Sequence, residues 1–438
     1  MSEAVATSQQ GLTGKYLPYP EYKDSGVVWL GEMPSTWVLA KTARYFKIAM
    51  GQTILKEQLE DDGEWPVYSA TEGDHYFGRV NNPQVRLGCG DLVIPARGNS
   101  IGFVKLVKEQ VTTTQTTIYC KHLTQKIYPE YAYYFMVGQK KNLFWFTQTA
   151  IPQITVEEIG SNPILLPSFE EQRTIAAFLD YETSRIDRLI AQQQRLIELL
   201  KEKRQTVISH AVTKGLNPNA PMKDSGVEWL GQVPEHWQIQ KTAWHFTAQK
   251  GRNGQMLTKE YCGENSGDYP VYSGQTENNG IMGRIDSFEF DFGNDGCLFS
   301  TTVGAKAMSL SLLKGKFSLS QNCMVIIPRE NNAFSVSFAF YHFQPLFSYE
   351  RGLIPEHMQA SFRMDDLYQY SIAMPPVSEQ IEISDFINGE VIKIDYLVQI
   401  AEKAITLMQE RRSALISAAV TGKIDLRGWT QPAEEVAA

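Results

Sequence analysis

The chain carries KDSGVVWLGEMPSTWVLAKTARYF at residues 23–46 and repeats it as KDSGVEWLGQVPEHWQIQKTAWHF at residues 223–246. The two stretches are identical at 14 of 24 positions, at an offset of 200 residues. A match of this length within one chain indicates an internal duplication. The sequence therefore predicts two copies of one fold.

The correspondence between the two halves continues beyond these stretches and then fades. WPVYS at residues 65–69 matches YPVYS at residues 269–273. A second strong match, at an offset of 208, joins residues 167–189 to residues 375–397. Each half thus has similar ends and a divergent middle.

The matches at the larger offset predict two long helices, because both stretches lack proline after their first one or two residues and carry apolar residues at alternating spacings of four and three. The predicted seams are Ile175, Leu179, Ile186, Leu189, Leu196, Leu200 and Val207 in the first helix and Ile383, Ile387, Ile394, Leu397, Ala401, Ala404, Met408 and Leu415 in the second. A repeat of 3.5 residues is typical of coiled coils, so we expect the two helices to pair with each other. At about 1.5 Å per residue, about 44 residues give a rod of roughly 65 Å.

The ends of these helices have expected signals. Ser168 and Ser378 are the expected N-cap residues, and the helices are expected to stop near Gly215 and Gly422.

The divergent middles consist of short β-rich runs separated by Gly, Asn and Pro. Two aromatic stretches, residues 131–136 and 338–343, are expected to be core helices rather than base-stacking platforms. The predicted fold class is α+β, with two similar globular domains separated by two long antiparallel coiled-coil-like helices and related by an internal pseudo-twofold duplication. The expected boundaries are 1–165 for the first globular domain (repeat segment 16–46), 166–216 for the first helix, 217–374 for the second globular domain (repeat segment 223–246), 375–424 for the second helix and 425–438 for the C-terminal tail.

Composition excludes several classes of protein. With 41 Lys and Arg against 49 Asp and Glu, the net charge is −8, which excludes a polycation that coats nucleic acid indiscriminately. The five cysteines form no C-x-x-C spacing, which argues against a disulfide framework and a zinc site. The sequence has no signal peptide and no apolar run of 18 residues, so we expect a cytoplasmic protein with no membrane partner.

Signatures of catalysis are also missing from the sequence. It contains no G-x-x-x-x-G-K-[ST] phosphate loop, no H-E-x-x-H zinc pair and no G-x-S-x-G nucleophile elbow. We therefore predict a noncatalytic chain with no catalytic residues, no metal site and no cofactor of its own.

Two unequal globular domains on long helices form a device that could read a two-part linear target. DNA is such a target. A symmetric dimer reads a palindrome, whereas one chain with two different domains can read two different half-sites at a fixed separation.

Three paired motifs carry a family resemblance. They are the KDSGV-x-WLG-x-x-P-x-x-W segments, the Glu-Gln helix starts within Pro167–Ile175 and Pro375–Ile383, and the I-S-x-A-V-T helix ends at 208–213 and 416–421. Arranged twice and in this order, they closely resemble the DNA-specificity subunit of type I restriction-modification enzymes. The resemblance extends from about residue 16 to residue 426.

The resemblance implies a noncatalytic subunit with two target-recognition domains, each of which reads one half of an asymmetric, interrupted site in double-stranded DNA. It also implies that two methyltransferase subunits dock on the central helices and that restriction subunits, with nuclease and translocase activity, complete the assembly. S-adenosylmethionine, ATP and Mg would then be bound by these partner subunits.

The expected DNA-binding residues are polar side chains on loops of the divergent middles, where they could reach base edges in the major groove. In the first half they are Thr71, His75, Tyr76, Arg79, Arg97, Asn99, Ser100, Gln115, Gln148 and Gln153. In the second half they are Gln275, Asn278, Asn279, Arg284, Thr301, Thr302, Lys306, Gln321, Arg351, His357 and Gln359. Arg79 and Arg284 occupy matched Gly-Arg positions, which favours phosphate contact or a structural role over base reading.

Two other interpretations stay open at this point. One is a coiled-coil scaffold whose two domains bind proteins and not DNA. The other is a self-sufficient DNA methyltransferase, which binding of S-adenosylmethionine by the isolated chain would reveal.

Overall fold

The structure, a computed structural model, describes residues 16–73, 75–98, 100–144, 153–275, 277–304, 306–329, 334–355 and 357–432. It divides into two compact units. Unit 1 takes in the chain up to Gln194 together with the residues from Glu402 onward, and unit 2 is Arg195–Ala401. Each unit contains one globular part and one half of each long helix, so the boundaries between compact units fall inside the helices.

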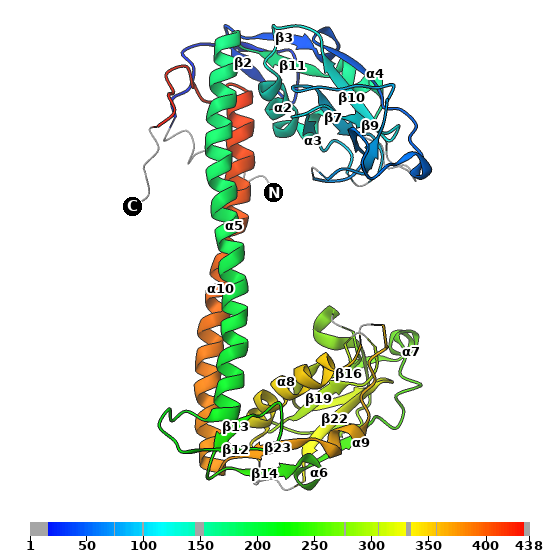
Figure 1. Ribbon diagram of the computed structural model, residues 1–438, viewed down its shortest axis with the longest axis vertical. Coiled ribbons are helices and arrows are strands. Elements are labelled where there is room, and N and C mark those ends of the chain that lie inside the picture. The colour runs from blue at the N-terminus through cyan, green and yellow to red at the C-terminus, as the bar shows by residue number, and fades with distance from the viewer. Residues whose placement is uncertain are drawn as a thin grey trace. The chain divides into compact units, whose positions relative to one another are not determined.

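Unit 1 combines a four-stranded sheet with smaller sheets and short helices (Figure 1). The four-stranded sheet has the order β4 (Phe46–Met50), β10 (Thr117–His122), β7 (Leu92–Pro95) and β8 (Lys105–Leu106). A three-stranded sheet has the order β6 (Gly78–Val80), β5 (Trp65–Tyr68) and β9 (Thr112–Thr113), and two-stranded pairs join β1 (Tyr22–Asp24) to β2 (Glu32–Pro34) and β3 (Val38–Lys41) to β11 (Pro163–Leu166). The helices are η1 (Thr42–Arg44), η2 (Lys56–Gln58), α2 (Pro129–Gly138), α3 (Lys140–Leu143) and α4 (Val156–Ser161).

Unit 2 repeats this architecture with different details. It has two four-stranded sheets. The first has the order β15 (Phe246–Gln249), β22 (Cys323–Pro328), β19 (Cys297–Thr301) and β20 (Leu310–Leu313). The second has the order β17 (Ile281–Ile285), β16 (Ser266–Tyr272), β21 (Lys316–Leu319) and β18 (Phe290–Asp291). Pairs join β12 (Met222–Asp224) to β13 (Gln232–Pro234) and β14 (Gln238–Lys241) to β23 (Ser371–Met374). The helices are α6 (Thr242–His245), α7 (Lys259–Glu264), η3 (Glu277–Gly280), α8 (Val336–Gly352) and α9 (Met364–Gln369). The α+β class and the internal duplication predicted from the sequence are confirmed.

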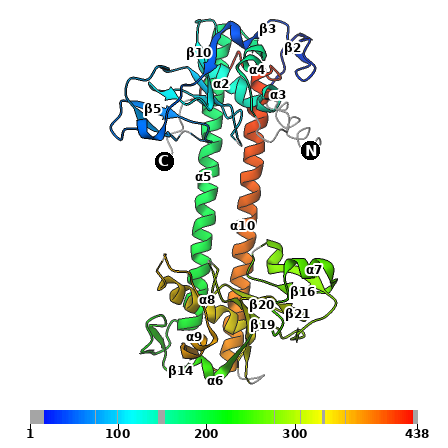
Figure 2. The same cartoon turned by 90° about the vertical axis from the view of Figure 1, so that its right-hand side faces the viewer.

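The two long helices are α5 (Phe169–Lys214) and α10 (Val377–Val420). In unit 1, Phe178 near the start of α5 packs on Trp429 beyond the end of α10, and Asp187 further along α5 pairs with Arg412 at 2.9 Å. In unit 2, Arg204 in the last third of α5 lies 3.5 Å from Asp395 in the first half of α10. Within each unit the two helices therefore run in opposite directions, as the views in Figure 1 and Figure 2 show.

The predicted seam is only partly buried. Most of its members are buried, among them Ile175, Leu179, Ile186, Leu200, Ile383, Ile387, Ile394, Ala401 and Leu415. The prediction is wrong for Leu189, Leu196 and Leu397, which are exposed. Apolar spacing identifies residues that share a face of a helix, but it does not show how far a neighbouring helix covers that face.

The helix ends agree with the sequence in three of four cases. The Ser168 hydroxyl accepts from the amide of Glu171 at 3.3 Å, as an N-cap does. Gly215 and Gly422 follow the helices at φ of +70° and +68°, a conformation that glycine adopts without strain. Ser378 is not the N-cap of α10, because the helix already includes Val377.

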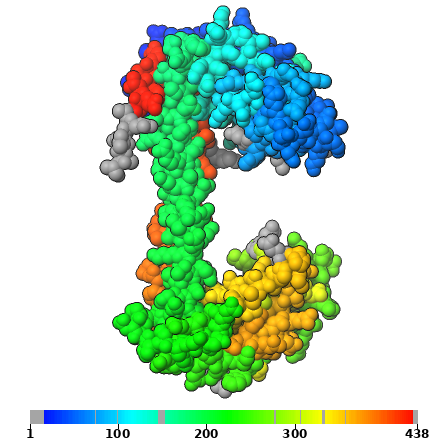
Figure 3. Space-filling view, viewed as in Figure 1, coloured from blue at the N-terminus to red at the C-terminus, as the bar shows by residue number. Residues whose placement is uncertain are grey.

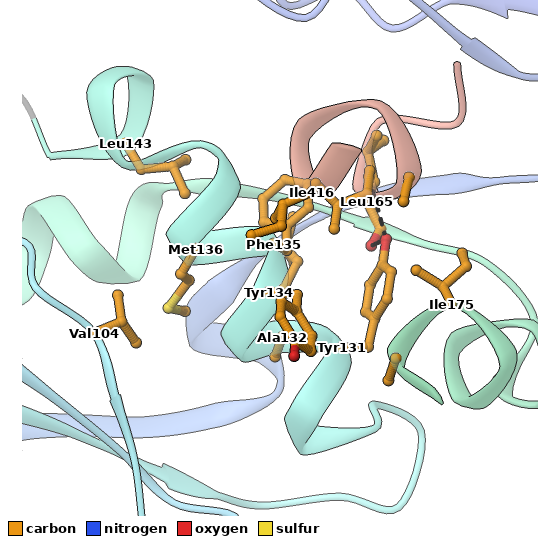
Figure 4. Packing of buried hydrophobic residues seen from close by; sticks show 14 of the residues in the cluster. Val104, Tyr131, Ala132, Tyr134, Phe135, Met136, Leu143, Leu165, Ile175 and Ile416 are labelled. Atoms are coloured by element: carbon orange, nitrogen blue, oxygen red, sulfur yellow. Dashed lines mark hydrogen bonds between the residues drawn. The ribbon is translucent and has the colours of Figure 1, made fainter. Parts of the chain in front are cut away.

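The two aromatic stretches are core helices, as predicted. In unit 1, Tyr131, Ala132, Phe135 and their neighbours on α2 are buried against β11 and α10 (Figure 4). The Tyr131 hydroxyl donates to the carbonyl of Leu165 at 3.0 Å. A Cβ placed on Gly138 would lie 2.9 Å from Cγ2 of Ile416, so α2 approaches α10 closely at this glycine.

No helix in the described part of the chain combines the length and the apolar character that a membrane crossing requires.

Candidate nucleic-acid interface

Four segments of unit 1 meet where strands β5, β7 and β9 end. The amide of Thr114, just after β9, donates to the carbonyl of Tyr68 at the end of β5 (3.0 Å). The amide of Ala96, just after β7, donates to the carbonyl of Thr116, and the amide of Ile154 donates to the carbonyl of Ala96, both at 3.0 Å. These bonds bring together the loops after β5, β7 and β9 and the segment before α4, which we call the polar edge of unit 1.

Unit 2 has the same set of backbone bonds at its equivalent strands. The amide of Ser320 donates to the carbonyl of Tyr272 at 2.8 Å, and the amide of Thr302 donates to the carbonyl of Asn322 at 2.8 Å. The amide of Phe362 donates to the carbonyl of Thr302 at 2.7 Å. The loops after β16, β19 and β21 and the segment before α9 therefore form the polar edge of unit 2.

The two halves of the chain also match a known family as two separate regions. The model of the family described as "Type I restriction modification DNA specificity domain" matches residues 34–199 and residues 246–401. These two matches cover well over half of the chain. The chain belongs to this family. The resemblance seen in the sequence is confirmed, and each half of the chain contains one specificity domain with one polar edge.

Several curated relatives of the chain come from Mycoplasma pneumoniae. A putative type I specificity subunit, S.MpnORF507P, is 34% identical over 140 residues, which are 32% of this chain and 36% of the relative. The specificity subunit of the type I restriction enzyme MpnII is 29% identical over 138 residues, which are 31% of this chain and 39% of the relative. These matches thus span little more than a third of each relative, about the length of one specificity domain.

Solved structures extend the similarity of the fold to most of the chain. A chain from a study of complex assembly and conformational transition of the type I R-M system aligns with a TM-score of 0.69 at 14% identity, over 89% of this chain and 98% of that one. The HsdS subunit from Thermoanaerobacter tengcongensis aligns with a TM-score of 0.50 at 13% identity, over 90% of this chain and 98% of that one. At these identities the likeness concerns the fold.

Most of the predicted DNA-binding residues that the structure describes are exposed, and most of these lie on loops of the two specificity domains. In the first domain the exposed residues are Thr71, His75, Tyr76, Arg97, Gln115 and Gln153. In the second they are Gln275, Asn278, Asn279, Lys306, Gln321, Arg351, His357 and Gln359. Arg351 is an exception, because it lies in the last turn of α8 and donates through Nη1 to the carbonyl of Ala307 at 3.0 Å. Asn99 and Gln148 lie outside the described residues.

The polar edge of the first specificity domain contains three of these residues, Arg97, Gln115 and Gln153. Arg97 and Gln153 form a β-bridge, which places them side by side. The amide of Gln115 offers its oxygen to the hydroxyl of Thr53, which donates at 2.9 Å. The backbone of the edge is therefore fixed by hydrogen bonds, while Arg97 and Gln153 keep exposed polar side chains.

Three predicted residues are buried within their own specificity domains. The Ser100 hydroxyl donates to the carbonyl of Ala70 at 2.7 Å, which ties the loop after β7 to the loop after β5. The Thr301 hydroxyl donates to the carbonyl of Lys306, and Thr302 is also buried. Ser100 and Thr301 therefore hold their loops together, whereas the hydroxyl of Thr302 has no hydrogen-bond partner among the described residues. None of the three side chains faces the solvent.

Arg79 and Arg284 are bound to backbone carbonyls at matched places. Arg79 donates through Nε to the carbonyl of Gly63 and through Nη2 to that of Glu64, the latter at 3.0 Å. Arg284 donates through Nη1 to the carbonyl of Asp268 at 2.6 Å. Arg79 thus fixes the residues just before β5, and Arg284 binds a residue within β16, which favours the structural role for both.

A buried lysine under the polar edge was not foreseen from the sequence. Lys105 is 1% exposed, its ammonium lies 3.3 Å from the hydroxyl of Thr71, and it lies 4.9 Å from the centre of the Tyr68 ring. A cation over an aromatic face is stabilised by the ring's quadrupole. Nothing in the pattern around Lys105 distinguishes it from a solvated lysine, so sequence alone gave no signal for this support.

The loop after β5 carries a second polar support at Tyr76. Its hydroxyl donates to the carboxylate of Glu109 at 2.6 Å. Two effects raise the pKa of Tyr76 well above its usual value, and partial burial contributes more than this hydrogen bond. The phenol therefore stays protonated near neutral pH and acts as a donor.

Within the described residues, no group of three or more His, Cys, Asp or Glu side chains is arranged to hold a metal ion. The five cysteines are free, with Cys89 exposed and the others buried.

Proposed function

We propose that this chain is the DNA sequence-recognition subunit of a type I restriction-modification complex, and that each polar edge reads one half of an asymmetric two-part site. The observation that carries the proposal is the duplicated edge. The same backbone bonds occur in both specificity domains, but the exposed side chains that they present differ. Two domains with the same backbone arrangement but different exposed polar side chains are suited to reading two different half-sites.

The reading is proposed to occur in the major groove. Arg97 and Lys306 supply charge for phosphates or for guanine edges, while Gln153, Gln275 and Asn278 offer paired donor and acceptor groups for adenine edges. Phosphate contacts form first and give binding a strong salt dependence, and a match at both half-sites then completes the complex.

The helices α5 and α10 are proposed to set the gap between the half-sites. They contain 46 and 44 residues, which corresponds to roughly 65–70 Å of helix. A continuous helix is stiffer than a flexible linker, so its length fixes the separation that two half-sites must have.

The same helices are proposed to dock two methyltransferase subunits. In unit 2, Ile392, Tyr396 and Ile400 recur every four residues on α10 and are exposed, the first two at 69% and 63%. Leu196 and Leu199 on α5 are exposed as well. Figure 3 shows the middle of α5, in green, with no other part of the chain covering the side turned toward the viewer. A recurring apolar stripe on a helix is typical of a surface that another helix covers.

The chemistry is proposed to belong to other chains. Methyltransferase subunits would bind S-adenosylmethionine and flip one adenine in each half-site, because its amino group is not accessible within the stack. Restriction subunits with nuclease and translocase activity would bind ATP and Mg. This chain would supply recognition and assembly.

A map of methylated bases tests the proposal. Long-read sequencing of cells that express this chain with its methyltransferase subunit would be compared with cells in which only this chain is deleted. We expect an asymmetric motif in two parts with a fixed gap, and its methylation should disappear on deletion. A continuous palindromic motif would contradict the two-edge mechanism.

A second measurement separates recognition from the scaffold alternative. The purified complex with methyltransferase subunits should bind its two-part site at least a thousandfold more tightly than unrelated DNA at the same salt concentration. Equal binding to both DNAs would favour the scaffold.

A further inference from the structure

In unit 1, the side chain of Tyr19 occupies a buried site next to the start of α5. Its hydroxyl donates to Oε1 of Glu171 at 2.5 Å, and the indole Nε1 of Trp37 donates to the same oxygen at 3.1 Å. The ring packs edge-on against Trp37 with a centroid distance of 5.6 Å, and the guanidinium of Arg427 lies over it at 5.1 Å. The site thus binds a phenol through one carboxylate and an aromatic wall.

Unit 2 keeps the carboxylate and the indole of this site but has no phenol. The duplication places Trp237 at the position of Trp37, Glu379 at that of Glu171 and Asn219 at that of Tyr19. Asn219 is exposed. Trp237 is fully buried, and its Nε1 has no hydrogen-bond partner among the described residues. A buried donor without an acceptor destabilises the protein, so this indole favours a ligand that supplies one.

A cavity of about 320 Å³ lies at this place in unit 2. Its lining is formed by Lys214, Gly215, Leu216, Asn217, Ala220, Pro234, His236, Ser378, Glu379 and Glu382. A Cβ placed on Gly215 would lie 3.2 Å from Oε1 of Glu379 and 3.4 Å from Cζ2 of Trp237. Cζ2 is next to the ring carbon that carries Nε1, so the polar edge of the indole lies close to Gly215, a residue of the lining, while Trp237 itself is buried directly behind that lining.

We propose that this cavity binds the tyrosine side chain of a partner polypeptide. A phenol hydroxyl can donate to Oε1 of Glu379 and accept from Nε1 of Trp237, which provides the acceptor that the indole lacks. Oε2 of Glu379 is engaged by Nε2 of His236 at 2.8 Å, so Oε1 is the oxygen that faces the ligand. The lining holds two carboxylates, Glu379 and Glu382, against one ammonium, that of Lys214, and this excess of negative charge disfavours an anion, whereas a phenol is neutral near pH 7.

The surroundings of the cavity favour a polypeptide over a free phenol. Leu216 in the lining is exposed, and so are Val377 and Ile381 on the first turns of α10, next to Ser378 and Glu382. Apolar side chains around the cavity offer contact to residues that flank a tyrosine. The template in unit 1 is itself a tyrosine within the short segment YLPYPE, residues 16–21.

The test uses the full chain labelled with ¹⁵N in its tryptophan indoles. The Trp237 signal is assigned with the W237F variant, and 4-methylphenol, the side chain of tyrosine, is titrated against toluene, which lacks only the hydroxyl. We expect 4-methylphenol to shift the Trp237 indole signal to saturation and toluene to leave it in place. The Trp37 signal serves as an internal control and should not move, because Tyr19 already occupies its site.

Two variants and a peptide pair sharpen the result. E379Q should weaken 4-methylphenol binding by about tenfold, because a hydrogen bond to a charged acceptor is replaced by a neutral one. N219Y, at an exposed position, should fill the cavity and abolish the shift. The acetylated peptide YLPYPE should bind more tightly than 4-methylphenol, and YLPFPE should bind at least tenfold more weakly than YLPYPE.

Three outcomes would overturn the proposal. They are a Trp237 signal that does not respond to 4-methylphenol, an equal response to toluene, and peptides that bind without regard to the tyrosine hydroxyl. Binding of 4-methylphenol without binding of YLPYPE would assign the cavity to a free phenol and overturn the polypeptide ligand. The test involves neither DNA nor a methyltransferase, so its failure would leave the proposed recognition of DNA untouched.

Discussion

His342 on α8 should make unit 2 sensitive to acid. This side chain is fully buried, its Nδ1 lies 3.2 Å from the carbonyl of Val212 and its Nε2 accepts from the amide of Ala373 at 3.3 Å. A ring that donates through one nitrogen and accepts through the other is neutral. Burial, only partly opposed by the bond to Val212, lowers the pKa of His342 from 6.5 to about 4.

The sign of the effect follows from proton binding. Between pH 6.5 and pH 4 the unfolded chain binds a proton at His342 that the folded chain does not, so the free energy of unfolding falls as the pH falls through this range. At pH 5 the expected loss is about 2 kcal/mol, which corresponds to roughly a thirtyfold increase in the population of the opened state. The stability is fully present above pH 6.5 and is lost progressively toward pH 4.

Unit 1 provides the matched control. The duplication places Phe135 at the position of His342 and Tyr131 at that of Phe338. In unit 1 the Tyr131 hydroxyl donates to the carbonyl of Leu165, so α2 is bonded to β11 without a histidine. The double variant F338Y/H342F transfers this arrangement to unit 2 and should remove the histidine's contribution to the pH dependence.

Hydrogen exchange measured by mass spectrometry, corrected for intrinsic rates, reports both units in one experiment. Between pH 7.5 and pH 5, amides of α8 should lose about thirtyfold in protection relative to those of α2, and the double variant should lose much less. Glu350, also on α8, has the opposite effect on the pH dependence of stability, because its pKa is raised, mainly by burial and then by repulsion from Asp366. This residue is the same in the wild type and in the double variant, so it does not affect their comparison. The reasoning is refuted if the wild type and the double variant show the same pH dependence at α8.

Three further predictions concern recognition. Inserting four residues after Leu200 adds about 6 Å to α5, and the gap in the methylated motif should lengthen by one or two base pairs, so an unchanged gap would contradict the role of the helices. R97A should weaken binding to the first half-site by about tenfold or more without changing the melting temperature. R79A should lower the free energy of unfolding by about 1 kcal/mol and leave the methylated motif unchanged. Loss of DNA binding without loss of stability in R79A would show that Arg79 touches DNA. K105M should weaken binding to the first half-site by about tenfold, because the ammonium near Thr71 supports the loop after β5. Binding to the second half-site, measured with duplexes that carry changes in one half-site at a time, should not change.

The sequence predicts the frame of this fold better than its surfaces. The repeat at residues 23–46 and 223–246 is long enough to establish two copies, and the two long helices follow from apolar spacing and from glycines at their ends. The same spacing fails at Leu189, Leu196 and Leu397. Periodicity states which residues share a face but not how far a neighbouring helix extends over that face.

The candidate site shows a different limit. Most of the predicted residues lie on loops, but the prediction is wrong for Arg79, Arg284 and Thr301, which lie in strands, and for Arg351, which lies in α8. Ser100 and Thr301 turn inward and bind backbone carbonyls, while Arg97 and Gln153 stay exposed. A short hydroxyl side chain can satisfy its own loop as readily as it can face a ligand, and the choice depends on contacts with loops distant in sequence. The pairing of the Ser100 hydroxyl with Ala70 is such a contact.

The duplication separates what the fold requires from what each half can change. Both units bury a tryptophan beside the start of a long helix and an aromatic helix against the other long helix, so the apolar frame is preserved. The hydrogen bonds within that frame are not. A hydroxyl of Tyr131 in one unit has its counterpart in the imidazole of His342 in the other, and the phenol of Tyr19 has no counterpart at Asn219. A frame that tolerates such exchanges in its buried polar groups tolerates still larger ones on its exposed loops. Recognition of two unrelated half-sites by two related domains is therefore compatible with one stable architecture.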